Sequence, residues 1–252
     1  MHHRRLQTSR WLYHDDQLWV FDATGSVRVE AVPWRVGAIR PHPGHRTVLE
    51  LIRRARVPCV NPAAVLLRGY DRLSMLNELR EAGLPVPTMT IALGEERLDR
   101  FEPPLPAVVK VGNYHGGYGK ARPRDAEEWA NVKDLSFATE EYVTVEPYIA
   151  YTRDIRCLAV GGAAVGNGPA RPLLESQHGH GTLRDDTGAD VLRAYTTRAM
   201  EHLGADLLGL DFLETPDGAH ILLESNDTPG LAGFPEAARR AVAAVVRRQI
   251  EA

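Results

Sequence analysis

Two acidic residues and an asparagine near the carboxyl end have the types and the spacing of a divalent-metal site. Asp211 lies in one apolar run, and Glu224 and Asn226 end the next. A turn signal at 215–218, Thr-Pro-Asp-Gly, lies between the runs, which predicts two strands of a hairpin. Because side chains alternate along a strand, Glu224 and Asn226 share one face. Oxygen ligands of this kind suit Mg²⁺ bound to nucleotide phosphates, although an acidic hairpin with solvated carboxylates has the same pattern.

A glycine-rich segment in the middle of the chain has the composition of a phosphate-binding loop. A β-branched run, predicted to be a strand, places Lys110 near its end, and the loop that follows ends in Lys120. Its glycines allow the loop to bend over a ligand and to present backbone N–H groups: Gly116, Gly117 and Gly119. The spacing is not that of a P-loop, because Ala121 follows Lys120. A flexible hairpin with two solvent-exposed lysines would account for the same residues.

Two further strands carry groups that suit a nucleoside. The apolar run at 142–149 contains Glu146 and Pro147, and proline marks the end of a strand or a hinge. Such a hinge, with free backbone groups, could receive an adenine ring. On the next strand Asp154 and Arg156 point to one face, where they suit ribose and phosphate. A cross-strand salt bridge is the usual explanation of such an alternating acid and base, and it stays open here.

In this order the segments resemble the ATP-grasp superfamily, and most closely its branch of ribosomal-protein glutamate ligases and synapsins. Residues 108–120 resemble the synapsin-type glycine loop, whereas residues 154–161 and 224–231 resemble the glutamate-ligase type. The resemblance covers about residues 71–250. It implies an α+β chain with the ATP-grasp fold, in which two α/β subdomains sandwich the nucleotide.

The resemblance also implies a division of the chain. Residues 71–252 would form the ATP-grasp domain, with a small lid subdomain at about 86–150 and a metal-binding subdomain at about 151–252. Residues 1–70 would be a shortened N-terminal α/β domain, since relatives usually carry a longer substrate-binding domain there. Substrate contacts would then come from the central cleft, from the partner chain of a homodimer, or from a carrier or precursor protein.

The residues quoted above would have the following roles by resemblance. Asp211, Glu224 and Asn226 would ligate one or two Mg²⁺ ions, with Mn²⁺ as a substitute. Arg156 would lie beside the transferred phosphoryl group. The other contacts to ATP would come from the loop, the hinge and their neighbours: Arg72, Lys110, Gly116, Gly117, Gly119, Lys120, Glu146, Pro147, Tyr148, Ile149 and Asp154.

At two positions the chain departs from the family's pattern. Arg72 stands where many members have a lysine before the lid, and a planar guanidinium differs in shape from an ammonium. His180 is the nearest equivalent of an arginine or lysine that relatives often place before the last strands, and a histidine cation is present only at lower pH. His180, a candidate catalytic residue with Arg156, therefore either acts on the substrate or caps a loop. The role of His178 is equally open.

The activity implied by the resemblance is that of an ATP-dependent carboxylate–amine ligase. A substrate carboxylate would attack the γ-phosphorus of ATP to form an acyl-phosphate. An amine would then displace phosphate, which leaves an amide or peptide bond together with ADP and phosphate. Two alternatives stay open: a synapsin-like ATP-binding protein without ligase chemistry, and a small-molecule kinase on the same fold. The acid and the amine, whether small molecules, peptides or protein tails, are not specified by the sequence.

Composition places the chain among ordinary globular proteins. Of its 252 residues 44% are hydrophobic and 25% charged, and the formal net charge of −3 gives no reason to expect nucleic acid or a membrane as partner. We find neither a run of 18 apolar residues nor a signal-peptide pattern. Cys59 and Cys157 lie far apart in apolar runs, which predicts buried reduced thiols and a cytoplasmic protein.

Periodicity and turn signals predict the elements that position these residues. A β-meander is expected at 11–39. In the last long helix before the hairpin, Val191 and Leu192 are both expected to face inward. The expected helices are 45–56, 71–82, 125–129, 188–203 and 234–250.

Overall fold

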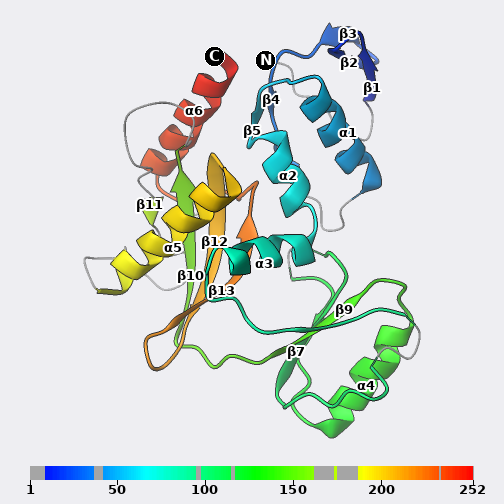
Figure 1. Cartoon of the computed structure of the whole chain (residues 1–252), viewed down its shortest axis with the longest axis vertical. Coiled ribbons are helices and arrows are strands. Elements are labelled where there is room, and N and C mark those ends of the chain that lie inside the picture. The colour runs from blue at the N-terminus through cyan, green and yellow to red at the C-terminus, as the bar shows by residue number, and fades with distance from the viewer. Residues whose placement is uncertain are drawn as a thin grey trace.

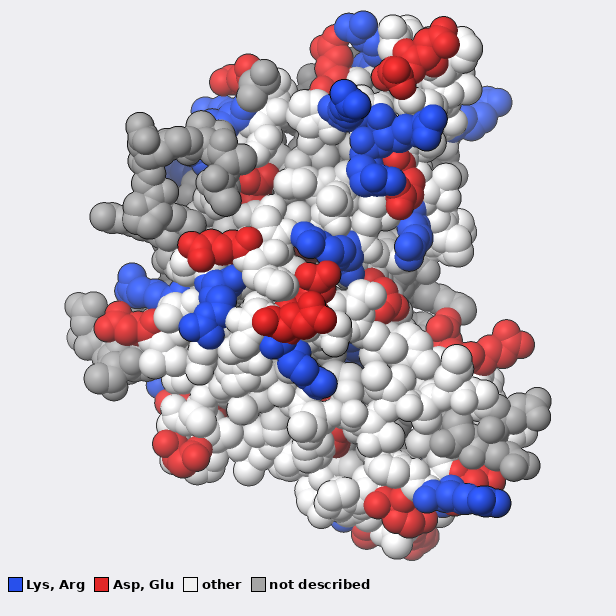
Figure 2. Space-filling model, in the orientation of Figure 1, with Lys and Arg blue, Asp and Glu red and all other residues white. Residues whose placement is uncertain are grey.

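The computed structural model describes residues 9–36, 42–94, 98–114, 117–161, 173–174, 187–232 and 234–251. The N-terminal portion of the chain, the described part of residues 1–70 and called the front portion below, lies at one end of the molecule (Figure 1). A small sheet that contains β7 and β9 lies at the other end, and a larger sheet that contains β10, β12 and β13 lies between them. Helices pack beside both sheets, so the predicted α+β class is confirmed. On the face shown in Figure 2, the described acidic and basic side chains are interspersed.

The front portion combines an antiparallel meander with a short βαβ unit. Strands β1, β2 and β3 are neighbours in that order, whereas β4 and β5 pair in parallel across the helix α1. Leu18 and Trp34 pack with the apolar face of α1 into one core. Periodicity does not predict α2, because seven residues make only about two turns. The bounds are β1 (Arg10–His14), β2 (Gln17–Asp22), β3 (Gly25–Arg28), β4 (Val32–Pro33), α1 (Pro43–Arg54), β5 (Cys59–Val60) and α2 (Ala63–Gly69).

The small sheet has the order β6-β9-β7-β8, and α4 packs against it through the buried Trp129. Asp125 caps α4, since its carboxylate accepts a hydrogen bond from the Glu128 N–H at 2.9 Å. The prediction that this helix ends at residue 129 is wrong. Its last turn exposes 76% of Leu135 and 64% of Phe137, so the apolar period is lost there. The bounds are β6 (Thr90–Ala92), β7 (Ala107–Val111), β8 (Lys120–Ala121), α4 (Ala126–Phe137) and β9 (Val143–Pro147).

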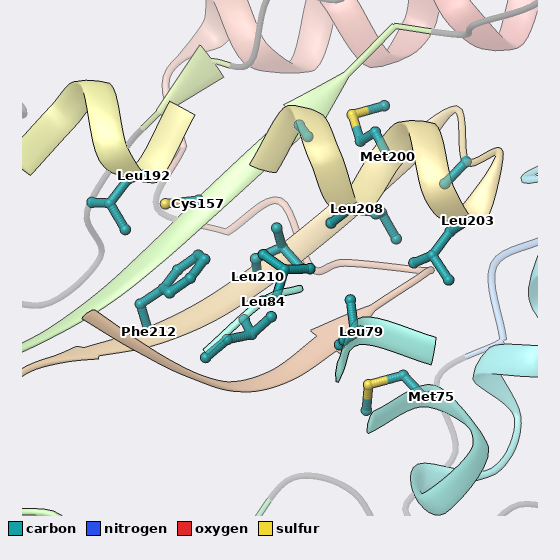
Figure 3. Packing of buried hydrophobic residues seen from close by; sticks show 14 of the residues in the cluster. Met75, Leu79, Leu84, Cys157, Leu192, Met200, Leu203, Leu208, Leu210 and Phe212 are labelled. Carbon is teal, nitrogen blue, oxygen red and sulfur yellow. The ribbon is translucent and has the colours of Figure 1, made fainter. Parts of the chain in front are cut away.

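The larger sheet has the order β11-β10-β12-β13, with antiparallel neighbours throughout. One face is apolar along its length and packs against α3 and α5, as Figure 3 shows for Met75 and Leu79 of α3 and Leu192 and Met200 of α5. The bounds are α3 (Arg72–Glu81), β10 (Arg153–Val160), β11 (Leu173–Leu174), α5 (Thr187–Leu203), β12 (Leu207–Glu214), β13 (His220–Asn226) and α6 (Glu236–Glu251).

The opposite face of the larger sheet is divided along the strands. At one end Leu158 and Leu207 pack with Val242 of α6 into a separate core. At the other end the same face carries the polar residues Arg156 and Asp211, because side chains alternate along β10 and β12. The polar side chains of Arg156 and Asp211 therefore lie on the part of this face that α6 does not cover.

One side-chain prediction for α5 is wrong. Val191 is 41% exposed, whereas its neighbour Leu192 is fully buried. The buried stripe continues through Thr196, Ala199 and Leu203. The helix is therefore rotated so that the stripe begins at Leu192, which packs on the apolar face of the sheet.

Asn61 joins the front portion to the larger sheet. Its side chain is fully buried and donates hydrogen bonds to the carbonyls of Leu207 at 2.6 Å and Asp227 at 2.7 Å. Its carbonyl oxygen accepts from the N–H groups of Asp206 and Leu207, both at 2.7 Å. A single amide therefore satisfies backbone groups at the start of β12 and just after β13.

Replacing Asn61 with alanine is expected to lower the free energy of unfolding by about 3 kcal/mol, since it leaves buried backbone groups unpaired. Chemical denaturation measures the change. Asn77→Ala is the matched control, because Asn77 is exposed on α3 and donates to the Glu81 carboxylate. If Asn61→Ala costs no more than the control, the amide does not hold the two parts together.

The two cysteines are free and buried, as predicted. Burial raises the pKa of each thiol, Cys59 and Cys157, to about 12. Both groups therefore stay protonated at pH 8, and neither is expected to react with an aromatic disulfide reagent in the native protein. In denaturant the reagent should count two thiols, and Cys59→Ala should reduce the count to one. Rapid labelling of the native protein would contradict this reading.

None of the helices in the described ranges is both long enough and apolar enough to cross a membrane.

Candidate functional site

A cavity of about 360 Å³ lies between the small sheet and the larger sheet. Its walls come from β7, β8 and β9, from the segment that links the two sheets, and from β10, β12 and β13. Residues that are distant in the sequence meet there, and most of them are predicted nucleotide or metal contacts. The predicted residues that line the cavity are Lys110, Lys120, Glu146, Pro147, Tyr148, Ile149, Asp154, Arg156, Asp211 and Glu224.

Lys110 and Glu146 form a buried ion pair on the small sheet. The Lys110 Nζ lies 2.7 Å from both carboxylate oxygens of Glu146, and both residues are almost fully buried. Burial lowers the pKa of Lys110, against the opposing effect of the Glu146 carboxylate. Lys120 lies opposite Lys110 in the register of β7 and β8, so the cavity has two cationic side chains on this wall.

The hinge after β9 forms the next part of the wall. The Tyr148 N–H donates to the carbonyl of Pro106 at 3.1 Å, and the Arg122 guanidinium lies 4.9 Å from the centre of the Tyr148 ring. Val108 and Leu213 add apolar surface from the two sheets. This part of the cavity therefore has apolar walls beside the polar Asp154, a combination that suits a flat aromatic ring attached to a sugar.

Arg156, Asp211 and Glu224 form a row across three neighbouring strands, because Asp211 of β12 pairs with Arg156 of β10 on one side and with Glu224 of β13 on the other. The Arg156 guanidinium, a planar fork of N–H donors, binds the Asp211 carboxylate in a bidentate manner. Its Nε donates to Oδ1 at 2.5 Å and its Nη2 donates to Oδ2 at 2.6 Å. Burial raises the pKa of Asp211, and the bonds from Arg156 oppose that rise. The cross-strand salt bridge considered for Arg156 is therefore present.

Asn226 lies on the same face of β13 as Glu224 and opposite Gly209 of β12. A β-carbon on Gly209 would lie 2.9 Å from the Pro229 ring, so only glycine lets the segment after β13 pack this closely over the sheet. No group of three His, Cys, Asp or Glu side chains suited to a metal is found among the described residues. The candidate set is instead two carboxylates and one amide, and its oxygens suit a hard divalent cation.

The start of the glycine-rich loop is held by the beginning of α3. The buried Arg72 donates through its guanidinium to the carbonyl of Tyr114, and its N–H donates to the Asn113 side chain at 2.9 Å. The Asn113 amide in turn donates to the carbonyl of Tyr70. Arg72, predicted to contact the nucleotide, therefore contacts the loop and is not part of the cavity wall.

The loop itself is described only in part. Gly117 and Gly119 have φ of +85° and +65°, values that favour glycine. Gly116 lies outside the described residues, and so do His178 and His180.

Comparisons with known proteins bear on the fold that carries this cavity. A family described as "Synapsin, ATP binding domain" matches residues 94–168. The D-alanine-D-alanine ligase from Coxiella burnetii superposes with a TM-score of 0.69 at 15% identity, over 96% of this chain and 72% of that one. The RimK domain protein ATP-grasp from Sphaerobacter thermophilus superposes with a TM-score of 0.64 at 21% identity, over 84% of this chain and 78% of that one. This chain has the ATP-grasp fold.

The ATP-grasp chain also resembles a protein of Saccharophagus degradans described as a probable alpha-L-glutamate ligase. The two are 26% identical over an alignment 255 residues long, gaps included, which covers 95% of this chain and 79% of that protein. N5-carboxyaminoimidazole ribonucleotide synthetase, in its ADP complex, superposes with a TM-score of 0.65 at 16% identity over 80% of this chain. This chain spans only 58% of that structure's length.

Four residues of the ATP-grasp cavity are absent from the predicted set: Val108, Tyr151, Leu213 and Leu223. Leu213 lies two positions after Asp211 on one strand, so the strand period could have placed it on the same face. Leu223 lies where the register of β12 and β13 shifts beside Asp211. That irregularity gives no signal in the sequence, because it depends on how the two strands pair.

Proposed function

We propose that this chain is an ATP- and Mg²⁺-dependent carboxylate–amine ligase, which forms an amide or peptide bond through an acyl-phosphate and releases ADP and phosphate. The cavity carries the proposal, because one space of about 360 Å³ joins the hinge and Lys110 to Asp211 and Glu224. Its size suits one small ligand such as a nucleotide. Ligase relatives support this choice of chemistry.

We assign the parts of the cavity to the parts of ATP. Glu146 and the hinge at 147–149 hold the adenine, Asp154 binds the ribose, and Lys110 and Lys120 bind phosphates. The glycine-rich loop covers the phosphates and excludes water, which would hydrolyse an acyl-phosphate.

We assign the end of the cavity that carries Asp211 and Glu224 to the binding of Mg²⁺ and of the phosphoryl group that is transferred. The two carboxylates and the amide of Asp211, Glu224 and Asn226 share one face of adjoining strands, so they fit a hard cation. Held there, Mg²⁺ would neutralise charge on the β- and γ-phosphates. Arg156 lies in the same row and is placed to bind an anionic phosphoryl oxygen.

The substrates are proposed from the relatives. The description of the Saccharophagus degradans protein makes L-glutamate the first amine to test, with a peptide or protein tail as the carboxylate. We retain the proposed division at residues 70/71, with the lid at about 86–150, and a homodimer, carrier or precursor protein as a source of substrate contacts. The two free cysteines suit a cytoplasmic protein.

Product analysis tests the reaction class. The protein, ATP and Mg²⁺ are incubated with pooled peptides and carboxylates, with and without L-glutamate. We expect ADP and phosphate in equal amounts, together with a product whose mass equals the two substrates minus water. A stable phosphoester would instead identify a kinase, and nucleotide binding without substrate-dependent ADP release would identify a binding protein. AMP and pyrophosphate would contradict the acyl-phosphate route.

A further inference from the structure

We infer that Arg156 covers the metal position at Asp211 and leaves it when the nucleotide binds, so that the metal and the nucleotide bind cooperatively. The inference rests on the proposed function for the identity of the site. It adds that Arg156 sets the order of assembly, in addition to any contact that it makes with the phosphoryl group.

The geometry of the ion pair carries this inference. Arg156 donates to both carboxylate oxygens of Asp211, at 2.5 and 2.6 Å; the Asp211 side chain is 14% exposed and that of Arg156 31%. A cation that binds at Asp211 needs at least one of these oxygens. It would also lie beside a guanidinium that cannot lose its charge. The charge and the hydrogen bonds of the guanidinium therefore oppose metal binding at this carboxylate until the guanidinium has moved.

The charges around the pair show what removal of the arginine would do. Among the described residues, the acidic groups whose charge acts on Arg156 are Asp211, Glu224 and Asp154, which come from β12, β13 and β10. Without Arg156 this part of the cavity would carry three carboxylates, with Lys110 and Lys120 on the opposite sheet. The Asn226 amide lies two positions from Glu224 on β13, outside the cavity lining. Such a set of carboxylates attracts a divalent cation even without nucleotide.

The nucleotide supplies what the fork needs to leave Asp211. The phosphates of ATP offer Arg156 other anionic oxygens that match its planar fork. When the Arg156 guanidinium moves from the Asp211 carboxylate to a phosphate, its N–H groups exchange one anionic acceptor for another. The same movement exposes the Asp211 oxygens. Each ligand therefore favours the other, and the coupling is reciprocal.

The test measures binding of Mn²⁺ alone, by the electron paramagnetic resonance signal of the free ion, to nucleotide-free protein. Arg156→Gln is expected to bind Mn²⁺ at least about tenfold more tightly than the unchanged protein. Arg156→Lys, which keeps the charge and loses the fork, should show a smaller gain. Arg153→Gln is the matched control, because Arg153 forms the same kind of cross-strand pair, with Glu214, on the same two strands. It should leave Mn²⁺ affinity unchanged.

Two further measurements make the result decisive. The gain in Arg156→Gln should disappear in the double variant Arg156→Gln/Asp211→Asn, and thermal unfolding confirms that the variants are folded. Equal Mn²⁺ affinity in Arg156→Gln and the unchanged protein would overturn the inference, as would a gain that survives loss of Asp211. The unchanged protein is also titrated with Mn²⁺ in the presence of ATP. If it binds no Mn²⁺-ATP, the proposed function fails, whereas normal Mn²⁺-ATP binding without the Arg156→Gln gain refutes this inference alone.

Discussion

Glutamine in place of Glu224 is expected to slow substrate-dependent ADP release by at least about 10³-fold while the fold stays intact. An amide keeps the shape of the side chain and removes the negative charge that holds a divalent cation. Glu224 is the carboxylate of the row that forms no ion pair within the described ranges, whereas Asp211 is held by Arg156. Its charge also raises the pKa of Asp211, so its removal relieves repulsion in the folded protein.

The measurement combines turnover with thermal unfolding. Glu214→Gln is the control, because Glu214 lies on β12 near Asp211, pairs with Arg153 and is not part of the cavity wall. It should change ADP release by less than about twofold. Full activity in Glu224→Gln would remove the metal assignment, and a large loss of stability would show that the side chain supports the fold.

Methionine in place of Lys110 is expected to lower the free energy of unfolding by about 3 kcal/mol and to weaken ATP binding by at least about 100-fold. The stability loss follows because Glu146 keeps a buried carboxylate without its partner. The affinity loss follows because a phosphate contact disappears. The two effects have different causes, so they can be separated.

The double variant Lys110→Met/Glu146→Gln separates them. Neutral groups replace both charges, so most of the lost stability should return. Because Glu146 is itself assigned to the adenine, ATP affinity is compared with that of Glu146→Gln alone and should stay well below it. Lys133→Met is the control for loss of a lysine. Lys133 pairs with the exposed Glu102 at 3.4 Å and lies 5.9 Å from the centre of the Trp129 ring, so its loss should cost less than about 1 kcal/mol. Denaturant unfolding and calorimetric titration with Mg²⁺-ATP measure the two quantities. Recovery of nucleotide binding in the double variant would show that Lys110 serves the fold alone.

Local patterns in the sequence predict much of the candidate site. The alternation of side chains along one strand places Glu224 and Asn226 on one face, and the observed register makes Asp211 the cross-strand neighbour of Glu224. A proline after Glu146 marks the end of β9, where the hinge begins. The helix expected at 71–82 begins where predicted, since the Asp71 carboxylate caps it by accepting from the Ser74 N–H at 2.9 Å. These predictions succeed because each depends on residues close together in the chain. The subdomain boundaries and the roles of the site residues stay predictions.

Packing between elements decides what those patterns leave open. By resemblance both Lys110 and Arg72 are expected to contact the nucleotide, but the structure pairs Lys110 with Glu146 and turns Arg72 to the loop at Tyr114. The rotation of α5 that exposes Val191 likewise depends on the sheet beneath it.

The chain's sequence by itself determined the donor types, the strands that carry them and the turns between them. Only the tertiary structure decided which charges pair in the cavity, as with Arg156 and Asp211. The reason is physical: a local period sets the direction of a side chain, whereas its partner depends on which distant strand lies beside it.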